Sequence, residues 1–320
     1  MRCYTHTHRT MPKQRKSRQA PRYTPAGSTA PPEMIDLVDP TWIFKALGLI
    51  ILAALLCAYI TLCVLYAHAQ WQLVLHPSRT VTAIPASLNA TEVHFGVDAT
   101  GQPQLDGVFI PSDISANTNN TALLLHSGDG SLSDALPAAQ TLRDAHLNVL
   151  LFDYRGYGHS LGQHPTQASM QADATTALTY LTTTRRIPVS SIVIYGTGAG
   201  ASLAVKLCAD NPTLPALILQ SADGDFESRV RRDPRSKIVP VSLLFDQTFP
   251  LADPLHTLPT PKLLISTTTG PAPEIFQRAA DPKTTLELHP NDPTNLNQSL
   301  TRFLSANLAT PPPALTSQPK

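Results

Sequence analysis

Residues 196–200 read Gly-Thr-Gly-Ala-Gly, and they join an apolar run at 192–195 to a helical pattern at 199–210. A strand that turns sharply into a helix presents the central residue of the turn beside the backbone N–H groups of the helix N-terminus. In many enzymes that attack a carbonyl carbon, this central residue is the nucleophile. Here it is Gly198, which has no side chain, so the turn offers no group that can attack.

Three side chains elsewhere could supply a relocated nucleophile, acid and base: Ser202, Asp223 and His289. Ser202 follows Gly198 by one helical turn, so it would lie ~6 Å along the helix from the amides of the turn, whereas acyl transfer needs ~3 Å. A small helix residue packed against a sheet explains Ser202 more simply. Asp223 follows an apolar run, where aspartate also commonly forms turns. His289 stands where the last apolar run ends.

Ala199 begins the helical segment, with Thr197 close before it, and the family resemblance described below implies that the amide beside Ser127, next to His126, faces a ligand at the same turn as the amide of Ala199. Such amides bind anions because they point outward from a helix N-terminus or a tight loop. His126 ends an apolar run, so it either orients the loop or acts on a ligand. A small anionic or acyl ligand and a protein partner both remain open. We expect no metal and no cofactor.

A dinucleotide site is a separate alternative. Gly196-x-Gly198-x-x-Ala201 after a strand satisfies the G-x-G-x-x-G/A fingerprint, and Asp223 lies near the place of a ribose-binding acid. That fingerprint usually opens its domain. Here several apolar runs precede it, which disfavours this interpretation.

Short apolar runs alternate with helix-length segments along most of the chain. This alternation predicts a mostly parallel sheet with helices on both faces, because a strand buried on two faces is apolar throughout. Residues 91–97 and 105–110 alternate instead and predict a hairpin. The predicted strands are 122–125, 149–152, 192–195, 216–219, 262–265 and 285–288, and the predicted helices are 133–146, 167–184, 199–210 and 297–307. Residues 223–259, rich in arginine and proline, predict a small cap or insertion.

Residues 46–67 form an apolar run of 22 residues without a charge. A helix needs roughly 20 residues to cross ~30 Å of hydrocarbon, so we expect a transmembrane anchor at 43–68. Ala67-His68-Ala69 resembles a signal-peptide cleavage pattern, but the run exceeds the usual apolar core of a signal peptide. Basic residues precede the run, which favours a cytoplasmic N-terminus and an extracytoplasmic domain, periplasmic in a bacterium. A start at Met34 would remove most of that basic bias.

The two ends of the chain are expected to be disordered: residues 1–42, which are basic and proline-rich, and residues 309–320. The formal charge is +1 and 15% of residues are charged, so bulk charge gives no indication of nucleic-acid binding. Only Cys208 lies in the expected folded domain, which excludes an internal disulfide there. Cys208 is expected to be a buried helix residue, since Lys206 is the only positive charge close to it in sequence.

The stretch 152–160, Phe-Asp-Tyr-Arg-Gly-Tyr-Gly-His-Ser, precedes a helical segment that contains Asp-Ala at 173–174 and Ala-Leu-Thr-Tyr-Leu at 177–181. These residues resemble the serine-aminopeptidase-like branch of the α/β-hydrolase superfamily, in which FDYRGYGxS follows the fourth strand. The resemblance covers residues 72–308 and implies an α/β-hydrolase fold. It also implies that residues 196–200 are the nucleophile elbow, whose family pattern is G-x-S-x-G.

The chain departs from the family at each catalytic position. Relatives carry His-Gly-Asn-x-Gly after the third strand, where this chain has His-Ser-Gly-Asp-Gly at 126–130. The family's acid follows the strand before last, but residues 266–273 contain no aspartate. The family's histidine lies several residues beyond the last strand, whereas residues 290–295 contain none.

Two hypotheses follow from these departures. In the first, the chain is a membrane-anchored α/β-hydrolase-fold protein without hydrolase activity, a pseudoenzyme that acts as a binding or interaction module. In the second, it is an active esterase, lipase or peptidase whose relocated residues are Ser202, Asp223 and His289. Loss of the nucleophile alone removes almost all catalysis that depends on a triad, which favours the first hypothesis.

Overall fold

The computed structural model describes residues 40–80, 82–112, 120–232, 234–266, 274–288 and 293–308. The chain divides between Ala54 and Leu55 into two parts. Most of the expected N-terminal tail, all of the C-terminal tail and His289 lie outside the described residues.

Helix α1, Pro40–Ala69, contains the apolar run, and no residue in it is buried by the rest of the chain. Alanine and leucine favour the helix, and its apolar side chains surround it on all sides, as in a membrane span. Together with the 3-10 turn Gln70–Leu73 it is long and apolar enough to cross a bilayer.

An eight-stranded sheet forms the centre of the domain, with the strand order β10-β9-β8-β7-β4-β6-β3-β2. Strand β3 pairs antiparallel with β2 and β6, and the pairings from β6 through β10 are parallel. The expected hairpin and the six expected strands are present, mostly lengthened by one to three residues. Their bounds are β2 Thr91–Val97, β3 Pro103–Ile110, β4 Thr121–Leu125, β6 Asn148–Phe152, β7 Ile192–Gly198, β8 Ala216–Ala222, β9 Lys262–Ser266 and β10 Lys283–Glu287.

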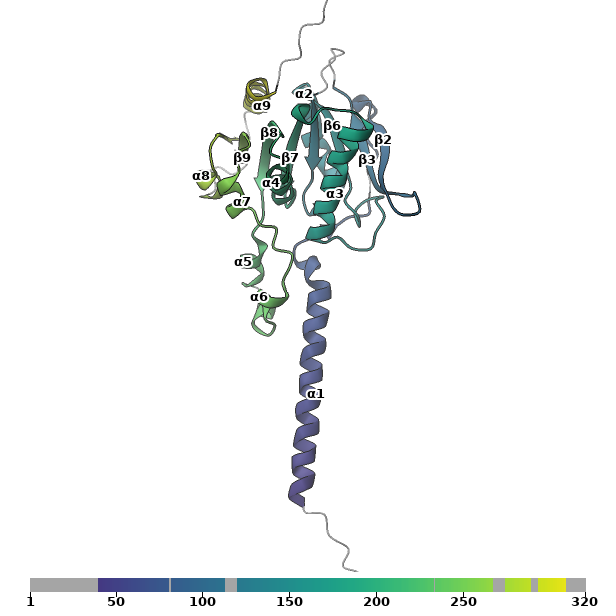
Figure 1. Ribbon diagram of the computed structural model, residues 1–320, viewed down its shortest axis with the longest axis vertical. Coiled ribbons are helices and arrows are strands. Elements are labelled where there is room, and N and C mark those ends of the chain that lie inside the picture. Colours follow the sequence, from purple (N-terminus) through teal and green to yellow (C-terminus); the bar gives the residue numbers. More distant parts are fainter. Residues whose placement is uncertain are drawn as a thin grey trace, which may run out of the picture. The chain divides into compact units, whose positions relative to one another are not determined.

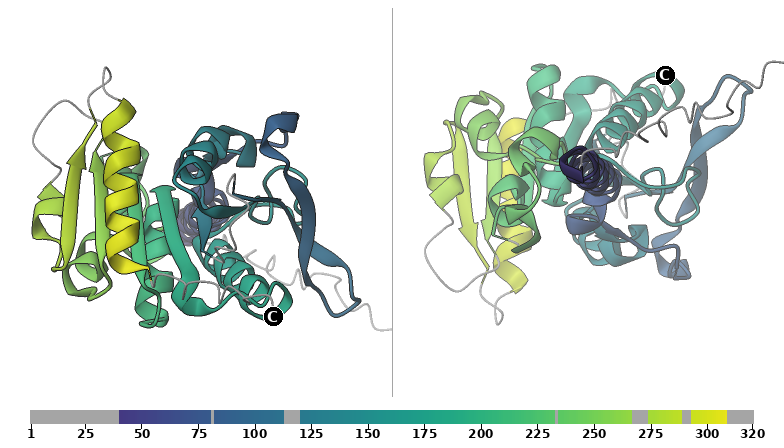
Figure 2. Two further views of the ribbon diagram at one scale, coloured as in Figure 1. Left: turned by 90° about the horizontal axis from the view of Figure 1, so that it is seen from above. Right: turned by 90° about the horizontal axis from the view of Figure 1, so that it is seen from below.

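Helices cover both faces of the sheet, which explains why its central strands are apolar at every position. In β4, Leu123 and Leu125 join the core beneath α3 and α4, whereas Ala122 and Leu124 face the core beneath α2 and α9. Helix α3 crosses in front of the strands, and α9 lies along one face (Figures 1 and 2). The bounds are α2 Leu136–Asp144, α3 Gln167–Thr179, α4 Gly200–Asp210 and α9 Pro293–Asn307.

The segment after α1 joins the domain through a short pairing that the sequence did not reveal. Strand β1, His76–Pro77, pairs in parallel with β5, Asp129–Gly130. The N–H of His76 donates to the carbonyl of Gly128 at 2.9 Å, and that of Ser78 to the carbonyl of Gly130 at 2.7 Å. The chain that leaves α1 is therefore bonded to the loop after β4.

The region 223–259, which the sequence suggests is a small cap or insertion, contains short helices. They are α5 Phe226–Val230, the 3-10 turn Pro234–Lys237, α6 Val241–Leu244 and α7 Ala252–Thr257, and α8 Glu274–Arg278 lies further along the chain. Phe226 and Phe249 pack edge to face with ring centroids 5.4 Å apart, which fixes α5 against the chain that returns to the sheet.

Candidate functional site

The turn between β7 and α4 has the backbone of a nucleophile elbow. Gly198 has φ of +55°, a left-handed conformation that costs a residue with a side chain ~1–3 kcal/mol. Gly200 lies so close to the end of β4 that a Cβ there would be 2.3 Å from the carbonyl oxygen of Leu125. The tight turn from strand to helix therefore favours glycine at both 198 and 200. Gly198 is the residue at the position of the nucleophile in the elbow pattern.

The side chain of Ser127 fills the space over Gly198. A Cβ at position 198 would lie 2.5 Å from the Oγ of Ser127 and 2.9 Å from its Cβ. Real Cβ atoms do not approach other atoms this closely, so a serine at 198 could not enter unless Ser127 moved. The Ser127 hydroxyl also accepts a hydrogen bond from the N–H of Asp129 at 3.3 Å, which holds it within its own loop.

His126 and Asp153 form a buried pair beneath this loop. His126 Nδ1 bonds the carbonyl of Ser127 at 2.8 Å, and its Nε2 lies 3.7 Å from Asp153 Oδ1. Burial lowers the pKa of His126 to about 4 and raises the pKa of Asp153 to about 7, because both charged forms lose solvation. The Asp153 carboxylate accepts a hydrogen bond from the N–H of Leu132 at 2.7 Å. At neutral pH His126 is uncharged, which suits a role in orienting the loop.

The two tyrosines of the FDYRGYG motif are hydrogen-bonded to the main chain of the same loop. Tyr154 donates to the carbonyl of His126 at 3.2 Å, and Tyr157 donates to that of Gly128 at 2.8 Å. The His126 ring packs against both, with centroids 4.5 Å from Tyr154 and 5.3 Å from Tyr157. The motif therefore fixes the main chain around Ser127.

The arginine of the motif ties its loop to α3. Arg155 Nε bonds Asp173 Oδ1 at 2.6 Å, and the Arg155 amide donates to Asp173 Oδ2 at 2.9 Å. Burial raises the pKa of Asp173, and the bonds from Arg155 oppose that shift. These contacts explain structurally why the motif and residues 173–174 occur together.

Ser202 has a structural partner and none of a nucleophile's contacts. It is 3% exposed, and its Oγ donates to the carbonyl of Pro250 at 2.7 Å, which ties α4 to the region 223–259. Cys208 is buried on the same helix, and burial raises the pKa of its thiol. Among the described residues, no hydrogen bond or ion pair joins either group to a histidine or a carboxylate, and Lys262 is the charged group that acts on the Cys208 thiol.

Asp223 lies next to the turn through its main chain, since its N–H donates to the carbonyl of Gly198 at 3.0 Å. Its carboxylate is bound by Arg229 at 2.7 Å. No hydrogen bond or ion pair among the described residues joins Asp223 to Ser202, and the histidine of the proposed set, His289, lies outside them. Thr197 and Ala199 flank Gly198, with Thr197 half-buried and Ala199 buried.

The position of β7 in the sheet does not support a dinucleotide site at the turn that follows it. Strands β2, β3, β4 and β6 precede it in the same sheet, and it lies between β4 and β8. The fingerprint belongs instead at the first strand of its fold. The candidate ribose-binding acid, Asp223, is already paired with Arg229.

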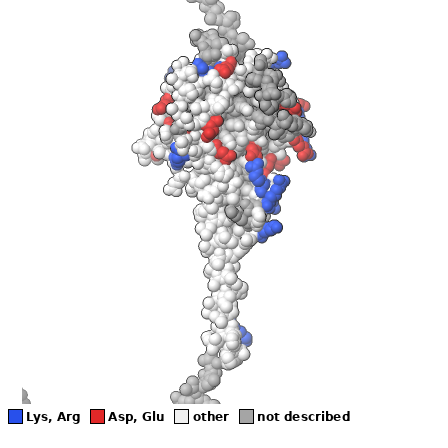
Figure 3. Space-filling model, turned by 180° about the vertical axis from the view of Figure 1, so that it is seen from behind, with Lys and Arg blue, Asp and Glu red and all other residues white. Residues whose placement is uncertain are grey.

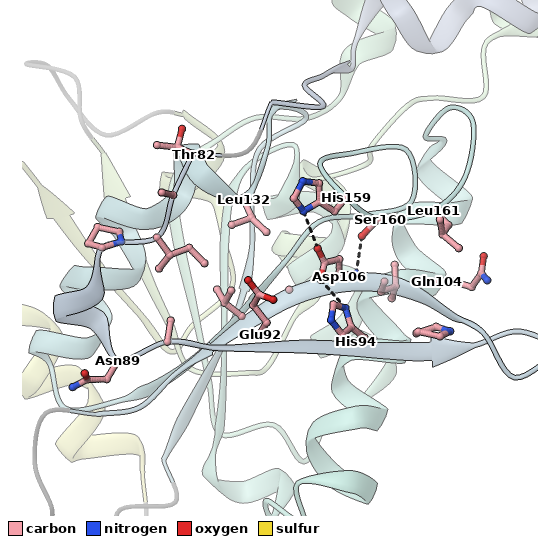
Figure 4. Close-up of a pocket in the computed structure, with 18 of the residues that line it drawn as sticks. Thr82, Asn89, Glu92, His94, Gln104, Asp106, Leu132, His159, Ser160 and Leu161 are labelled. Atoms are coloured by element: carbon pink, nitrogen blue, oxygen red, sulfur yellow. Dashed lines mark hydrogen bonds and ion pairs between the residues drawn. The ribbon is translucent and has the colours of Figure 1, made fainter.

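A second polar cluster, which the sequence analysis missed, lies in a groove of about 920 Å³ beside the β2–β3 hairpin (Figure 4). Asp106 joins two histidines there: Oδ1 lies 2.8 Å from His94 Nδ1, and Oδ2 lies 3.4 Å from His159 Nδ1. The nearby Ser160 is buried and donates to the carbonyl of Asp153 at 2.6 Å, so its hydroxyl serves the loop. The β2–β3 pairing places His94 opposite Asp106. The alternating pattern of the two strands in the sequence is the feature from which this contact could have been predicted.

No group of three histidine, cysteine, aspartate or glutamate side chains suited to a metal occurs among the residues that the structure describes. That the protein needs neither a metal nor a cofactor stays a prediction from the sequence.

Comparison with known families and proteins places these features in context. The model of the family described as serine aminopeptidase, S33, matches residues 117–302. Protein bem46 of Schizosaccharomyces pombe is 31% identical over 146 residues, which cover 45% of this chain and 48% of that protein. The uncharacterized protein YfhR of Escherichia coli O157:H7 is 31% identical over 127 residues, covering 38% and 44%. The matches thus span about half the length of these curated relatives.

Solved structures confirm the fold. A Pyrococcus furiosus esterase has a TM-score of 0.57 at 18% identity, covering 74% of this chain and 99% of its own. An α/β hydrolase of Vibrio vulnificus has a TM-score of 0.53 at 19% identity, covering 71% and 85%. At such identities the likeness shows the fold alone, which is the α/β-hydrolase fold that the sequence predicts.

Proposed function

Because the chain belongs to the serine aminopeptidase S33 family of the α/β-hydrolase superfamily, we propose that it is a member without serine hydrolase activity that serves as a membrane-anchored interaction module. The observation that carries this proposal is the elbow, where Gly198 stands at the nucleophile position and Ser127 fills the space above it. A triad without its nucleophile loses nearly all of a rate advantage on the order of 10⁶.

The contacts of the remaining candidates support the same proposal. The Ser202 hydroxyl is hydrogen-bonded to the Pro250 carbonyl, and the Asp223 carboxylate forms an ion pair with Arg229. In the sequence, the family's acid loop carries no aspartate and its histidine loop no histidine. The three departures remove the nucleophile, the acid and the histidine of the triad separately. The proposed loss of activity therefore does not depend on the elbow alone.

The partner that we propose is a protein rather than a small acyl or anionic ligand. In a hydrolase the acyl group is attacked by a side chain at the elbow, and here the side chain of Ser127 takes the space where the Cβ of such a side chain would stand. Three further contacts hold the loop that carries Ser127 in place, from Tyr154, Tyr157 and His76. A rigid, filled site suits recognition by its outer surface.

The test of lost activity is a fluorophosphonate probe, which forms a covalent adduct with an activated serine. The full chain in detergent is incubated with the probe and digested, and its peptides are weighed by mass spectrometry, with a serine hydrolase of known activity alongside. We expect no adduct and no hydrolysis of short-chain esters. An adduct on Ser202 or Ser127 would overturn the proposal and support the active-hydrolase hypothesis.

We also propose that the N-terminus is cytoplasmic and that the domain lies on the opposite side, because basic residues precede the apolar run. A cysteine added after Lys320 should react with a membrane-impermeant maleimide in intact cells, and a cysteine at the N-terminus should react only after lysis. The four native cysteines are first replaced. The reverse labelling pattern would refute this orientation.

A further inference from the structure

The segment 226–244, which contains α5 and α6, lies against the end of the membrane helix. We refer to it as the juxtamembrane segment. Tyr66 and Ala69 of the last turns of α1 line a cavity of about 240 Å³ together with Val230 and Ser236. Just beyond the segment, the N–H of Asp246 donates to Oε1 of Gln70 at 2.9 Å. The helix end and the juxtamembrane segment are thus in contact within one compact part of the chain.

The position of these contacts along α1 sets the depth of the juxtamembrane segment. The apolar run 46–67 has 22 residues, which at ~1.5 Å each span ~33 Å, about the thickness of the hydrocarbon layer. If α1 crosses the membrane, Tyr66 and Ala69 therefore lie where the hydrocarbon gives way to lipid head groups. Since Val230 and Ser236 line the same cavity, the segment lies at the head-group level as well.

Two large apolar side chains of the segment are turned outward. Ile238 is 62% exposed and Leu243 is 80% exposed. Outside α1, the only other exposed large apolar side chains among the described residues are Val97 and Leu161. Neighbouring Val230 and Val241 are buried, so the segment has one side packed on the domain and one apolar side left open.

The juxtamembrane segment that carries Ile238 and Leu243 is also positively charged. The segment carries five basic residues and two acidic residues, Glu227 and Asp233, a net charge of +3. Arg229 and Arg231 are paired with Asp223 and Glu227. Arg232 and Lys237 have no ion-pair partner within the described residues. In the space-filling view, lysine and arginine side chains gather at the lower right of the domain (Figure 3).

We propose that the juxtamembrane segment is a second membrane contact, in which Ile238 and Leu243 enter the interface and Arg232 and Lys237 bind lipid phosphates. Exposed apolar side chains flanked by unpaired cations are what an interfacial membrane contact requires. The bilayer is the occupant because α1 brings it to this side of the domain. The inference goes beyond the proposed function, since it concerns how the domain lies on the membrane.

The test measures the depth of single probes in the full chain. The native cysteines are replaced by alanine or serine, and single cysteines at 238, 243 or 97 carry an environment-sensitive fluorophore. Each variant is reconstituted into phosphatidylcholine vesicles that contain a nitroxide-labelled lipid, and co-flotation with the vesicles verifies that α1 has inserted. Position 97 is the matched control, because Val97 is 69% exposed in the hairpin.

We expect several-fold stronger quenching by the nitroxide lipid at 238 and 243 than at 97. The double variant Arg232→Glu/Lys237→Glu, probed at 243, should abolish any increase in quenching caused by added phosphatidylglycerol. Equal, weak quenching at all three positions in vesicles that co-float with the chain would overturn the proposal. It would mean that this surface meets a protein or water. Failure to co-float would contradict the premise that α1 inserts.

Discussion

The hydroxyl of Ser127 stands where a side chain at Gly198 would begin, 2.5 Å from the position of its Cβ. The resemblance to the serine-aminopeptidase-like branch implies glycine at position 127 and serine at position 198, and this chain carries the reverse. The two departures therefore form one packing unit, since a serine at either position excludes a side chain at the other.

A double-mutant cycle tests this coupling. Gly198→Ala should lower the free energy of unfolding by about 2–5 kcal/mol, because a left-handed backbone and a collision with Ser127 add together. In the Ser127→Gly background the collision disappears, and the cost should fall to about 1–3 kcal/mol. The measurement is denaturation of the full chain in detergent, followed by fluorescence of Trp71, which stacks on His164.

Gly101→Ala is the matched control for the backbone effect. Gly101 has φ of +84°, and no atom lies within 4 Å of the position that a Cβ would take there, so only the backbone strain applies. Its cost should not change when Ser127 is replaced. Equal costs of Gly198→Ala in both backgrounds would show that Ser127 does not fill the site.

Ser202→Ala separates a structural serine from a catalytic one. The change removes the hydrogen bond to the Pro250 carbonyl and should destabilise the domain by about 1–2 kcal/mol. It should leave ester hydrolysis and fluorophosphonate labelling at the background level of the unmodified chain. A measurable hydrolysis in the unmodified chain that this substitution abolishes would contradict the structural role.

The buried pair His126 and Asp153 predicts two opposite dependences of stability on pH. The pKa of Asp153 is raised from 3.8 to about 7, so between these values the unfolded chain releases a proton that the folded chain keeps, and stability falls as pH rises. The pKa of His126 is lowered from 6.5 to about 4, so the folded chain binds fewer protons there and stability rises with pH. In the unmodified chain the two contributions largely cancel.

Single substitutions should expose each contribution in turn. In Asp153→Asn only His126 remains, and its lowered pKa should make the unfolding free energy rise by roughly 3 kcal/mol between pH 4 and 6.5, whereas that of the unmodified chain changes little. In His126→Asn only Asp153 remains, and stability should fall over a similar range. Denaturant titrations at several pH values measure both slopes, and parallel profiles for all three chains would refute the assignment.

Lys262 is a buried cation whose ammonium group donates to the carbonyls of Leu258 and Ala280, each at 2.8 Å. Lys262→Met fills a similar volume but leaves these carbonyls unpaired, so it should cost about 2–4 kcal/mol of unfolding free energy. Lys206→Met, which breaks an exposed pair with Asp210, is the matched control and should cost less than about 1 kcal/mol. Equal effects in thermal unfolding would contradict this role of Lys262.

The sequence predicted the large elements well because each carries a strong local pattern. The run at 192–195 and the glycines after it identified β7 and its turn, and the FDYRGYG motif identified the loop beneath. The short helices of residues 223–259 escaped because four to six residues do not establish a helical period. Lys262 opens a predicted strand, but its burial depends on carbonyls from two distant loops.

The features of the site that escaped prediction are contacts between segments far apart in sequence. Nothing in the residues 126–130 indicates that Ser127 lies over Gly198, since the contact depends on the register of β4 and β7. The β1–β5 pairing has two residues on each side, too few for a periodic pattern. The cluster around Asp106 needed the pairing of β2 with β3 to become visible.

The pairing of His76 with the loop after β4 has a consequence for how a partner finds this protein. His76 follows the end of α1 by only seven residues, so the loop is within ~25 Å of the helix end even if the chain is fully extended. If α1 crosses a membrane as we propose, a partner anchored in the same bilayer would meet that loop by a search in two dimensions, at a high effective concentration. A contact too weak to form in solution is then enough for assembly.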